Sequence, residues 1–375
     1  MNINMQRIET EYNTERCYVH ARGLLLQNGF GLITMQKLEL SGCDVFYGLE
    51  MRKTTDGGKH FSAPVPCQNL RRRQLEDSTS LAFCDATPFY HKKTGRILLT
   101  GHAAIYGSNN KLLREPRRRS PLYAVYNEAL GDFEAFRAIE MPTENGDAYF
   151  SSGAGCTQIM EQENGELLIP IYYERQEPDA PRSTSAAAVM RCAFDGEQLR
   201  VLEIGTPLIT DVPRGFHEPS IVRHGGDYFL ALRNDRSGFI AKSRDGLHFD
   251  TPRALCFDDG ESLGNYNTQQ HWLTGGGRLW LVYTRRAGHN DHIFRHRAPL
   301  FIAQLDPTRM CVIRATERIA VPERGARLGN FGCQSYSDKI GYIFAAEWMQ
   351  NDPLGYEACA ARGSDNSIFL SQIIY

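Results

Sequence analysis

The sequence contains no apolar run of the roughly eighteen residues that a transmembrane helix needs. Its beginning, MNINMQRIETEYNTERC, also lacks the apolar core of a secretory signal peptide. From these two absences we expect a soluble protein of the cytoplasm, without a membrane partner.

Paired cysteines and a strong net charge are absent as well. The ten cysteines lie singly between Cys17 and Cys359, without Cys-x-x-Cys pairs and without the density of a disulfide scaffold. This pattern predicts reduced, mostly buried thiols. The formal net charge of −2 gives no basic field suited to nucleic acid, so we expect a small-molecule partner and no nucleic acid.

Long helical periodicity is also scarce. Short runs rich in Val, Ile, Leu, Phe and Tyr recur instead, each after a turn signal such as Lys-Thr-Gly or Gly-Gly-Gly. Examples are residues 31–35, 96–100, 166–173, 228–232, 278–283 and 341–346. The pattern predicts an all-β chain of hairpins. At 375 residues such an architecture fits one domain, residues 1–375.

Residues 214–235, RGFHEPSIVRHGGDYFLALRND, are the most informative stretch. Two apolar runs flank a His-Gly-Gly-Asp turn, which predicts a β-hairpin. Glu218 enters the first strand and Arg233 leaves the second, so the hairpin brings both side chains to the same end of one sheet. This pair is either a structural salt bridge or part of a binding site.

One turn motif repeats between the hairpins. Residues 54–61 read TTDGGKHF and residues 243–249 read SRDGLHF, with weaker echoes at 127–133 and 193–199. In the first two, a hydroxyl and a carboxylate can cap the amides of the turn. The intervals of about 50 to 70 residues are close to the period of a four-stranded propeller blade. This period predicts a β-propeller of roughly six blades.

These turns look like the Asp boxes, or BNR repeats, of the sialidase (neuraminidase) superfamily, whose members are six-bladed β-propellers. Other segments resemble that family in its order over nearly the whole chain. They are residues 22–29 (RGLLLQNG), 43–44 (CD), 84–95 (CDATPFYHKKTG), 151–155 (SSGAG), Glu218 with Arg233-Asn234, and 294–301 (FRHRAPLF).

The resemblance implies a site for an acidic sugar at the centre of one propeller face. Three arginines would surround the sugar's carboxylate, because guanidinium forms paired, charge-assisted hydrogen bonds with carboxylates. By position these are Arg22, Arg233 and Arg297. Arg295 competes for the third place, although the Ala-Pro that follows favours Arg297.

The resemblance also implies catalytic carboxylates. Asp44 matches the family's acid/base residue, and Asp85 is a second acid that contacts substrate or serves only as a turn residue. Glu218 matches the carboxylate that polarises the family's tyrosine nucleophile. His217, next to Glu218, either transfers a proton or orients its neighbour.

The chain departs from the family at the nucleophile. The family register, counted back from Glu347, places Phe331 where the tyrosine should stand, and a phenyl ring cannot attack. Three alternatives remain. Tyr336 serves in a shifted register, Tyr266 serves from another blade, or the reaction needs no tyrosine.

Residues 264–300 are rich in amide, imidazole and ring side chains, His271 among them, and such groups suit a carbohydrate site. We expect no metal and no cofactor, because the histidines lack the spacing of a metal motif.

The first hypothesis is therefore an exo-acting, sialidase-like glycoside hydrolase for a terminal acidic sugar, either a sialic acid or another ulosonic or uronic acid. The alternatives are a propeller polysaccharide lyase acting on uronate-containing glycans and a non-catalytic carbohydrate-binding propeller.

Overall fold

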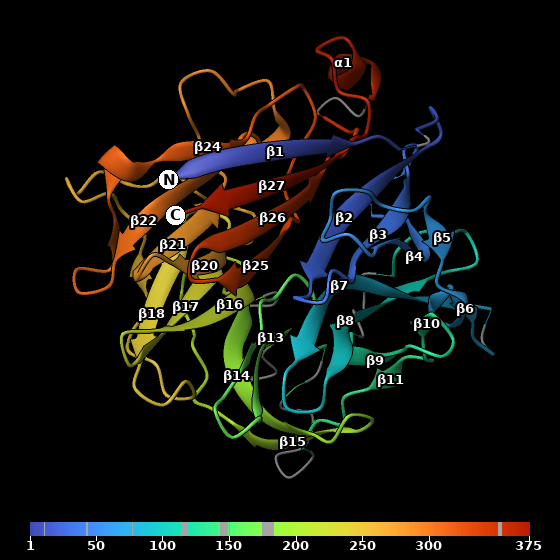
Figure 1. Cartoon of the computed structure of the whole chain (residues 1–375), viewed down its shortest axis with the longest axis horizontal. Coiled ribbons are helices and arrows are strands. Elements are labelled where there is room, and N and C mark those ends of the chain that lie inside the picture. The colour runs from blue at the N-terminus through green and yellow to red at the C-terminus, as the bar shows by residue number, and fades with distance from the viewer. Residues whose placement is uncertain are drawn as a thin grey trace.

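The computed structural model describes residues 1–10, 12–42, 44–76, 78–113, 119–142, 149, 151–174, 184–351 and 355–375. Within these ranges the regular secondary structure is almost entirely β-strand, with one short α-helix, α1 (Glu357–Ala360). Six antiparallel sheets are arranged around a central axis (Figure 1). The prediction of an all-β, six-bladed propeller is confirmed.

Three blades come from the first half of the chain. Their strands are β2 (Arg16–Leu25), β3 (Gly31–Glu39), β4 (Phe46–Thr54) and β5 (Val65–Pro66) in the first; β6 (Arg73–Gln74), β7 (Ser80–His91), β8 (Arg96–Tyr106), β9 (Pro121–Asn127), β10 (Asp132–Phe133) and β11 (Arg137–Ala138) in the second; and β12 (Met160–Glu161), β13 (Leu167–Glu174), β14 (Ser185–Phe194) and β15 (Leu199–Ile204) in the third.

The other three blades complete the ring. Their strands are β16 (His217–His224), β17 (Asp227–Arg233), β18 (Phe239–Ser243) and β19 (Arg253–Ala254) in the fourth; β20 (His271–Gly275), β21 (Arg278–Tyr283), β22 (Leu300–Asp306), β23 (Cys311–Val312) and β24 (Arg318–Val321) in the fifth; and β25 (Gly332–Ser337), β26 (Ile340–Ala346), β27 (Ile368–Ile374) and β1 (Asn2–Ile8) in the sixth. Three short 3-10 segments, η1 (Gln68–Leu70), η2 (Phe294–His296) and η3 (Arg314–Thr316), lie between strands.

The six apolar runs selected from the sequence fall in β3, β8, β13, β17, β21 and β26. Each pairs with the strand that precedes it in its blade, and in the second blade the short strand β6 lies on the other side of that partner. Nearly all residues of β13, β17 and β26 are buried, because these strands pack against the neighbouring blades on both faces. A strand buried on both faces reads as a continuous apolar run, which explains why these six were visible in the sequence.

The ring is closed by the two ends of the described chain. Strand β1 pairs with β27 in antiparallel register, from Asn2 opposite Ile374 to Ile8 opposite Ile368. The last blade therefore takes its outermost strand from the beginning of the chain (Figure 1). Backbone hydrogen bonds within the sixth blade thus join the beginning and the end of the described chain.

Both predicted turn motifs form the expected hydrogen bonds. The Thr54 hydroxyl accepts from the amides of Asp56 and Gly58, and the Asp56 carboxylate accepts from the amide of His60. Ser243 and Asp245 repeat this arrangement. The likeness of the two turns to Asp boxes remains a resemblance.

Two further expectations concern the thiols and the membrane. All nine cysteines of the described ranges are free and seven are buried, as predicted; Cys43 lies outside those ranges. In the same part of the chain, no helix is long and apolar enough to cross a membrane.

Candidate active site

Six residues with left-handed backbones lie at one end of the innermost segments, one in each blade. They are His20, Asp85, Cys156, Glu218, Asn267 and Asn330, with φ between 44° and 65°. We call them the inner ring. Such φ values cost non-glycine residues roughly 1–3 kcal/mol each and are retained mainly where function requires them.

Three members of the inner ring lie at breaks in strand register. The pairing shifts between Val19 and Arg22 in β2, between Cys84 and Thr87 in β7, and between His217 and Ser220 in β16. A bulge of this kind turns a side chain away from the direction the pleat would give it. The bulges therefore turn His20, Asp85 and Glu218 out of the regular alternation.

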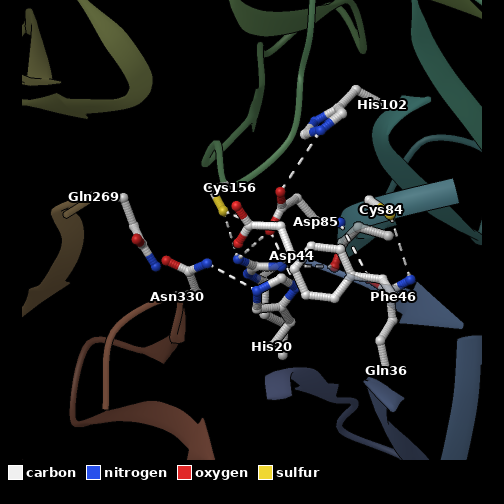
Figure 2. Close-up of polar contacts among 12 residues, drawn as sticks. His20, Gln36, Asp44, Phe46, Cys84, Asp85, His102, Cys156, Gln269 and Asn330 are labelled. Carbon is white, nitrogen blue, oxygen red and sulfur yellow. Dashed lines mark hydrogen bonds and ion pairs between the residues drawn. The ribbon is translucent and has the colours of Figure 1, made fainter. Parts of the chain in front are cut away.

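Asp85 is the centre of one half of the site (Figure 2). Its Oδ1 atom lies 3.1 Å from Nδ1 of His20 and accepts a hydrogen bond from the Cys156 thiol at 3.0 Å. Arg22 and His102 approach its carboxylate to 3.7 Å. Burial alone would raise the pKa of Asp85, but His20, His102 and Arg22 outweigh it and hold that pKa below the usual range.

The hydrogen-bond network fixes the protonation of His20. Gln269 is oriented so that its amide nitrogen donates to Oδ1 of Asn330 at 3.0 Å. Asn330 then donates from Nδ2 to Nε2 of His20 at 2.8 Å, so the neutral ring carries its proton on Nδ1. That Nδ1 atom lies 3.1 Å from Oδ1 of Asp85 but is not aligned for a hydrogen bond. Burial lowers the pKa of His20 to about 4, so the ring is neutral at pH 7. Figure 2 shows these four residues, each from a different blade.

Close backbone packing at residues 151–155 completes this half. A Cβ atom on Gly155 would lie 2.1 Å from Nδ1 of His102 and 2.7 Å from Cβ of Asp85. Only glycine fits there, which gives the Ser-Ser-Gly-Ala-Gly segment a physical role. Gly153 exchanges backbone hydrogen bonds with Tyr172, whose hydroxyl lies 3.5 Å from Nδ1 of His102.

Glu218 and Arg233 form the second half of the site, as the hairpin predicted. Arg233 donates to Oε1 of Glu218 and, at 2.7 Å, to Oδ1 of Asn267. Both side chains are almost buried, and Oε2 of Glu218 has no hydrogen-bond partner within the described ranges. A buried carboxylate oxygen left in this state favours a ligand that donates a hydrogen bond to it.

The side chain of Asn267 accepts hydrogen bonds from three guanidinium groups. Besides Arg233, its Oδ1 atom accepts from Arg295 at 3.1 Å and from Arg297 at 3.4 Å. Arg297 also donates from Nε to the backbone carbonyl of Asn267 at 3.1 Å. Burial lowers the pKa of Arg297 well below its ordinary value, and the charges of Arg233, Arg327 and Arg295 lower it further.

Arg327 is a fourth cation that the sequence did not single out. It is buried, its guanidinium lies 4.2 Å from the ring centre of Trp348, and it donates to Gln350 at 3.1 Å. Burial lowers its pKa to about 10. Its segment, Ala-Arg-Leu-Gly, carries no motif that would have identified it. We call Arg233, Arg295, Arg297 and Arg327 the cation cluster.

Arg22 lies apart from the shared contact at Asn267. It is fully buried, and its donors reach the backbone carbonyls of Phe331 (3.3 Å) and Ala86 (3.4 Å) and the sulfur of Cys156 (2.9 Å). It takes no part in the shared contact at Asn267. In this structure Arg22 therefore links three blades, while the guanidinium cluster forms around Arg233, Arg295 and Arg297.

Asp44 lies at the same end of the propeller, beside Asp85 and His20 (Figure 2). It is partly exposed and its backbone is left-handed, with φ of 56°. The charges that act on His20, Arg295 and Arg327 include that of Asp44. Asp44 thus lies within electrostatic range of both halves of the site.

The two predicted histidines are buried. His217 packs its ring 5.1 Å from that of Tyr172. His271 hydrogen-bonds with the Ser220 hydroxyl at 2.8 Å and the Phe331 carbonyl at 3.1 Å. Burial lowers the pKa of His271 to about 3, so it is a neutral link between inner strands.

The three candidate positions for the nucleophile lie apart. The ring of Phe331 is fully buried in an apolar cluster with residues such as Leu273, 5.1 Å from the His271 ring. Tyr336 packs against Tyr342, 5.4 Å away. The hydroxyl of Tyr266 is hydrogen-bonded to Nδ1 of His296. None of the three is hydrogen-bonded to Glu218, whose described partner is Arg233.

The other end of the inner strands holds a cavity of about 790 Å³. From the inner ring, strands β2, β7 and β16 and the start of β25 run two to three residues, roughly 7 to 10 Å, to reach its lining. We call it the far cavity. Its lining includes Leu25, Phe89, Tyr90, Met160, Val222, Arg223 and Tyr336. Tyr336 is thus separated from Glu218 by the length of the inner strands.

Comparisons with known proteins relate the chain to others by fold alone. No protein-family model and no curated protein sequence matches it. A solved structure of a protein of unknown function from Dyadobacter fermentans is 15% identical, with a TM-score of 0.66, and the match covers 99% of each chain.

Sialidases also share this propeller fold. Trypanosoma rangeli sialidase with the inhibitor DANA is 12% identical, with a TM-score of 0.63; the match covers 99% of this chain and 60% of that one. Hadza microbial sialidase Hz136 is 10% identical, with a TM-score of 0.64 and coverage of 96% and 66%. The chain therefore spans about 60% of the length of the trypanosomal enzyme.

Proposed function

We propose that this protein is a sialidase-like glycoside hydrolase that acts on a terminal acidic sugar. The sugar's carboxylate would bind at the cation cluster, between Arg295, Arg297 and Arg233. Asp44, at the edge of the site, would protonate the leaving oxygen, and Asp85 would accept a hydroxyl of the sugar. Glu218 would face the anomeric carbon and stabilise the positive charge that develops there.

The imbalance of charge in the cation cluster carries this proposal. Within the described ranges, Arg233 pairs with Glu218, whereas Arg295, Arg297 and Arg327 form no ion pair. Arg297 and Arg327 are buried, whereas Arg295 is exposed. A buried cation without a counter-charge is costly, so an anionic ligand is favoured beside Arg297 and Arg327. A carboxylate matches the planar donors of guanidinium, and the neutral amide of Asn267 occupies the shared position in its absence.

The sialidase neighbours support an acidic sugar as the ligand class. One solved structure is of Trypanosoma rangeli sialidase in complex with sialic acid, at 12% identity, a TM-score of 0.65 and 58% coverage of that chain. At 12% identity this neighbour supports the fold only. An acidic substrate is inferred from the cation cluster.

A non-catalytic carbohydrate-binding propeller is the second candidate. One observation favours it: no described tyrosine hydroxyl is hydrogen-bonded to Glu218, so the family's tyrosine–glutamate pair is not formed. Such a protein would bind the acidic sugar through the same cluster and release nothing.

Incubation with a panel of acidic oligosaccharides separates these candidates. The panel contains 3′- and 6′-sialyllactose, a glycoside of deaminated sialic acid and uronate oligosaccharides, and both free acidic sugar and ultraviolet-absorbing product are followed. Release of free sugar is expected. Ultraviolet absorption would indicate a lyase, and binding without product would indicate the binding propeller.

Two variants serve as controls for the site. Arg297→Ala should weaken the binding of N-acetylneuraminic acid at least tenfold, whereas Arg223→Ala, at the far cavity, should leave it unchanged. Equal affinities of parent and Arg297→Ala would contradict binding at the cation cluster.

A further inference from the structure

Tyr266 belongs to a hydrogen-bonded series of three side chains beside the cation cluster. Its hydroxyl bonds with Nδ1 of His296, and Nε2 of His296 lies 2.9 Å from Oδ1 of Asp291. Tyr266 is partly exposed. From the sequence, Tyr266 was a possible nucleophile, but no sequence pattern connected it with His296 or Asp291.

The backbone places this series next to the cation cluster. Tyr266 and Asn267 are neighbours in the chain, and so are Arg295 and His296. These two dipeptides face each other. Arg295 donates to Asn267, while His296 bonds with Tyr266. Arg295 and His296 have φ values of 55° and 52° within the 3-10 segment η2. Two consecutive left-handed residues are strained, and this strain directs their side chains to neighbouring partners.

The order of the three groups sets the direction of proton transfer. Asp291 can only accept a hydrogen bond when ionised, so Nε2 of His296 carries a proton. Nδ1 then has a free lone pair and accepts the proton of the Tyr266 hydroxyl. An oxygen bonded to a histidine that is oriented by a carboxylate is the general arrangement that activates a hydroxyl group.

We propose that Tyr266, His296 and Asp291 form a proton relay that activates the attacking water in the hydrolysis. This inference rests on the proposed function. Water attacks the anomeric carbon while its proton passes to the Tyr266 oxygen, and the phenol proton passes to Nδ1 of His296. The glycosidic bond breaks, and the leaving oxygen takes a proton from Asp44. His296 then carries a positive charge beside Asp291 until it returns the proton to solvent.

The charges around the phenol suit a relay. Burial raises the pKa of Tyr266, while Arg286, Arg295 and Arg297 lower it and Asp291 raises it. The net shift is upward, so the hydroxyl keeps its proton at neutral pH. A protonated phenol can pass a proton on only as it receives another, which couples its transfer to the attack of water.

The test compares Tyr266→Phe and Asp291→Asn with the parent on 3′-sialyllactose. Tyr266→Phe should lower kcat by about 10²–10⁴-fold with little change in KM, because only proton transfer is lost. Asp291→Asn should lower kcat about tenfold and move the acid limb of the pH–rate profile to lower pH, since the imidazolium loses its carboxylate. Tyr283→Phe is the matched control. It removes another hydroxyl of the same blade, one that donates a hydrogen bond to Glu317, and its kcat and KM should equal those of the parent.

The stereochemical course gives an independent readout. Direct attack by water inverts the anomeric configuration, so NMR should detect the inverted sugar as the first product. Retention, or a glycosyl adduct on Tyr266 after incubation with 2,3-difluorosialic acid, would overturn the relay, because the phenol would then be the nucleophile. Parent-like kcat in a folded Tyr266→Phe would also overturn it. Absence of turnover by the parent would refute the hydrolase itself, and the relay with it.

Discussion

The two ends of the inner strands differ although the same strands build both. At one end, each blade contributes a left-handed residue to the inner ring, and charged groups are buried beside it. At the other end, the far cavity is lined by aliphatic and aromatic side chains together with polar and more exposed charged ones such as Lys92, Glu161 and Arg223. The comparison shows that one set of strands can carry backbone strain and buried ion pairs at one end, while the charged side chains at the other end are more exposed to solvent.

The strained residues and buried ion pairs lie apart from the apolar clusters for an energetic reason. Left-handed residues and buried ion pairs each cost roughly 1–5 kcal/mol if they are left uncompensated. The apolar clusters between blades supply the stability that makes these costs tolerable. The predictions below test this difference between the ends, from the largest expected effect to the smallest.

Removal of Arg233 should have the largest effect. Arg233→Ala leaves Glu218 buried without its partner. We expect the free energy of unfolding to fall by about 3–5 kcal/mol. Arg223→Ala is the matched control in the same hairpin, because Arg223 pairs with Glu163 at the exposed rim of the far cavity. Urea unfolding of both variants measures the contrast. Equal losses would show that the two ends carry similar electrostatic energy.

Acid should destabilise the site end first. Burial lowers the pKa of His20 to about 4 and that of His271 to about 3, whereas an unfolded histidine titrates near 6.5. The unfolded chain therefore binds more protons below about pH 6.5, and stability falls as pH decreases from there. Each histidine contributes a slope of about 1.4 kcal/mol per pH unit.

The variant His271→Asn tests the source of this slope. It should reduce the slope of unfolding free energy between pH 4 and 6.5 by about half. Asp85, whose pKa is depressed, loses its contribution only below its unfolded pKa of about 3.9, outside this window. An unchanged slope in His271→Asn would assign the acid sensitivity to other groups.

Replacement of Glu218 by Gln should abolish turnover while it preserves the fold. We expect kcat to fall about 100-fold or more, which corresponds to about 2.7 kcal/mol, because the developing charge loses its carboxylate. Binding of N-acetylneuraminic acid should become tighter, since Glu218 no longer competes for Arg233. Calorimetric titration measures this gain, and weaker binding would contradict the proposed place of the sugar carboxylate.

The pair Phe331→Tyr and Tyr336→Phe should give the smallest effects. The Phe331 ring is fully buried among apolar side chains, so an added hydroxyl should cost about 1–3 kcal/mol. Tyr336 lies at the far cavity, and loss of its hydroxyl should change stability by less than about 0.5 kcal/mol. Thermal unfolding checks both. A gain of activity in Phe331→Tyr would instead support the family register.

Local sequence was sufficient for the strands and for one contact of the site. The apolar runs and turn residues of each hairpin act between neighbours in the chain, so β17 and its Gly225-Gly226 turn were predictable. The contact between Glu218 and Arg233 was predictable for the same reason, because both belong to one hairpin. The expected positions of Arg297 and Asp44 depended on resemblance to a family.

Tertiary structure decided the rest. The sequence determined a six-bladed propeller, since each blade repeats a pattern of local turns and apolar strands. It did not determine the pairing of β1 with β27, the bulges that turn His20 and Asp85 out of register, or the addition of Arg327 to the cation cluster. These features join residues from different blades, far apart in the chain. Their geometry depends on closure of the whole ring, and no short stretch of sequence encodes it.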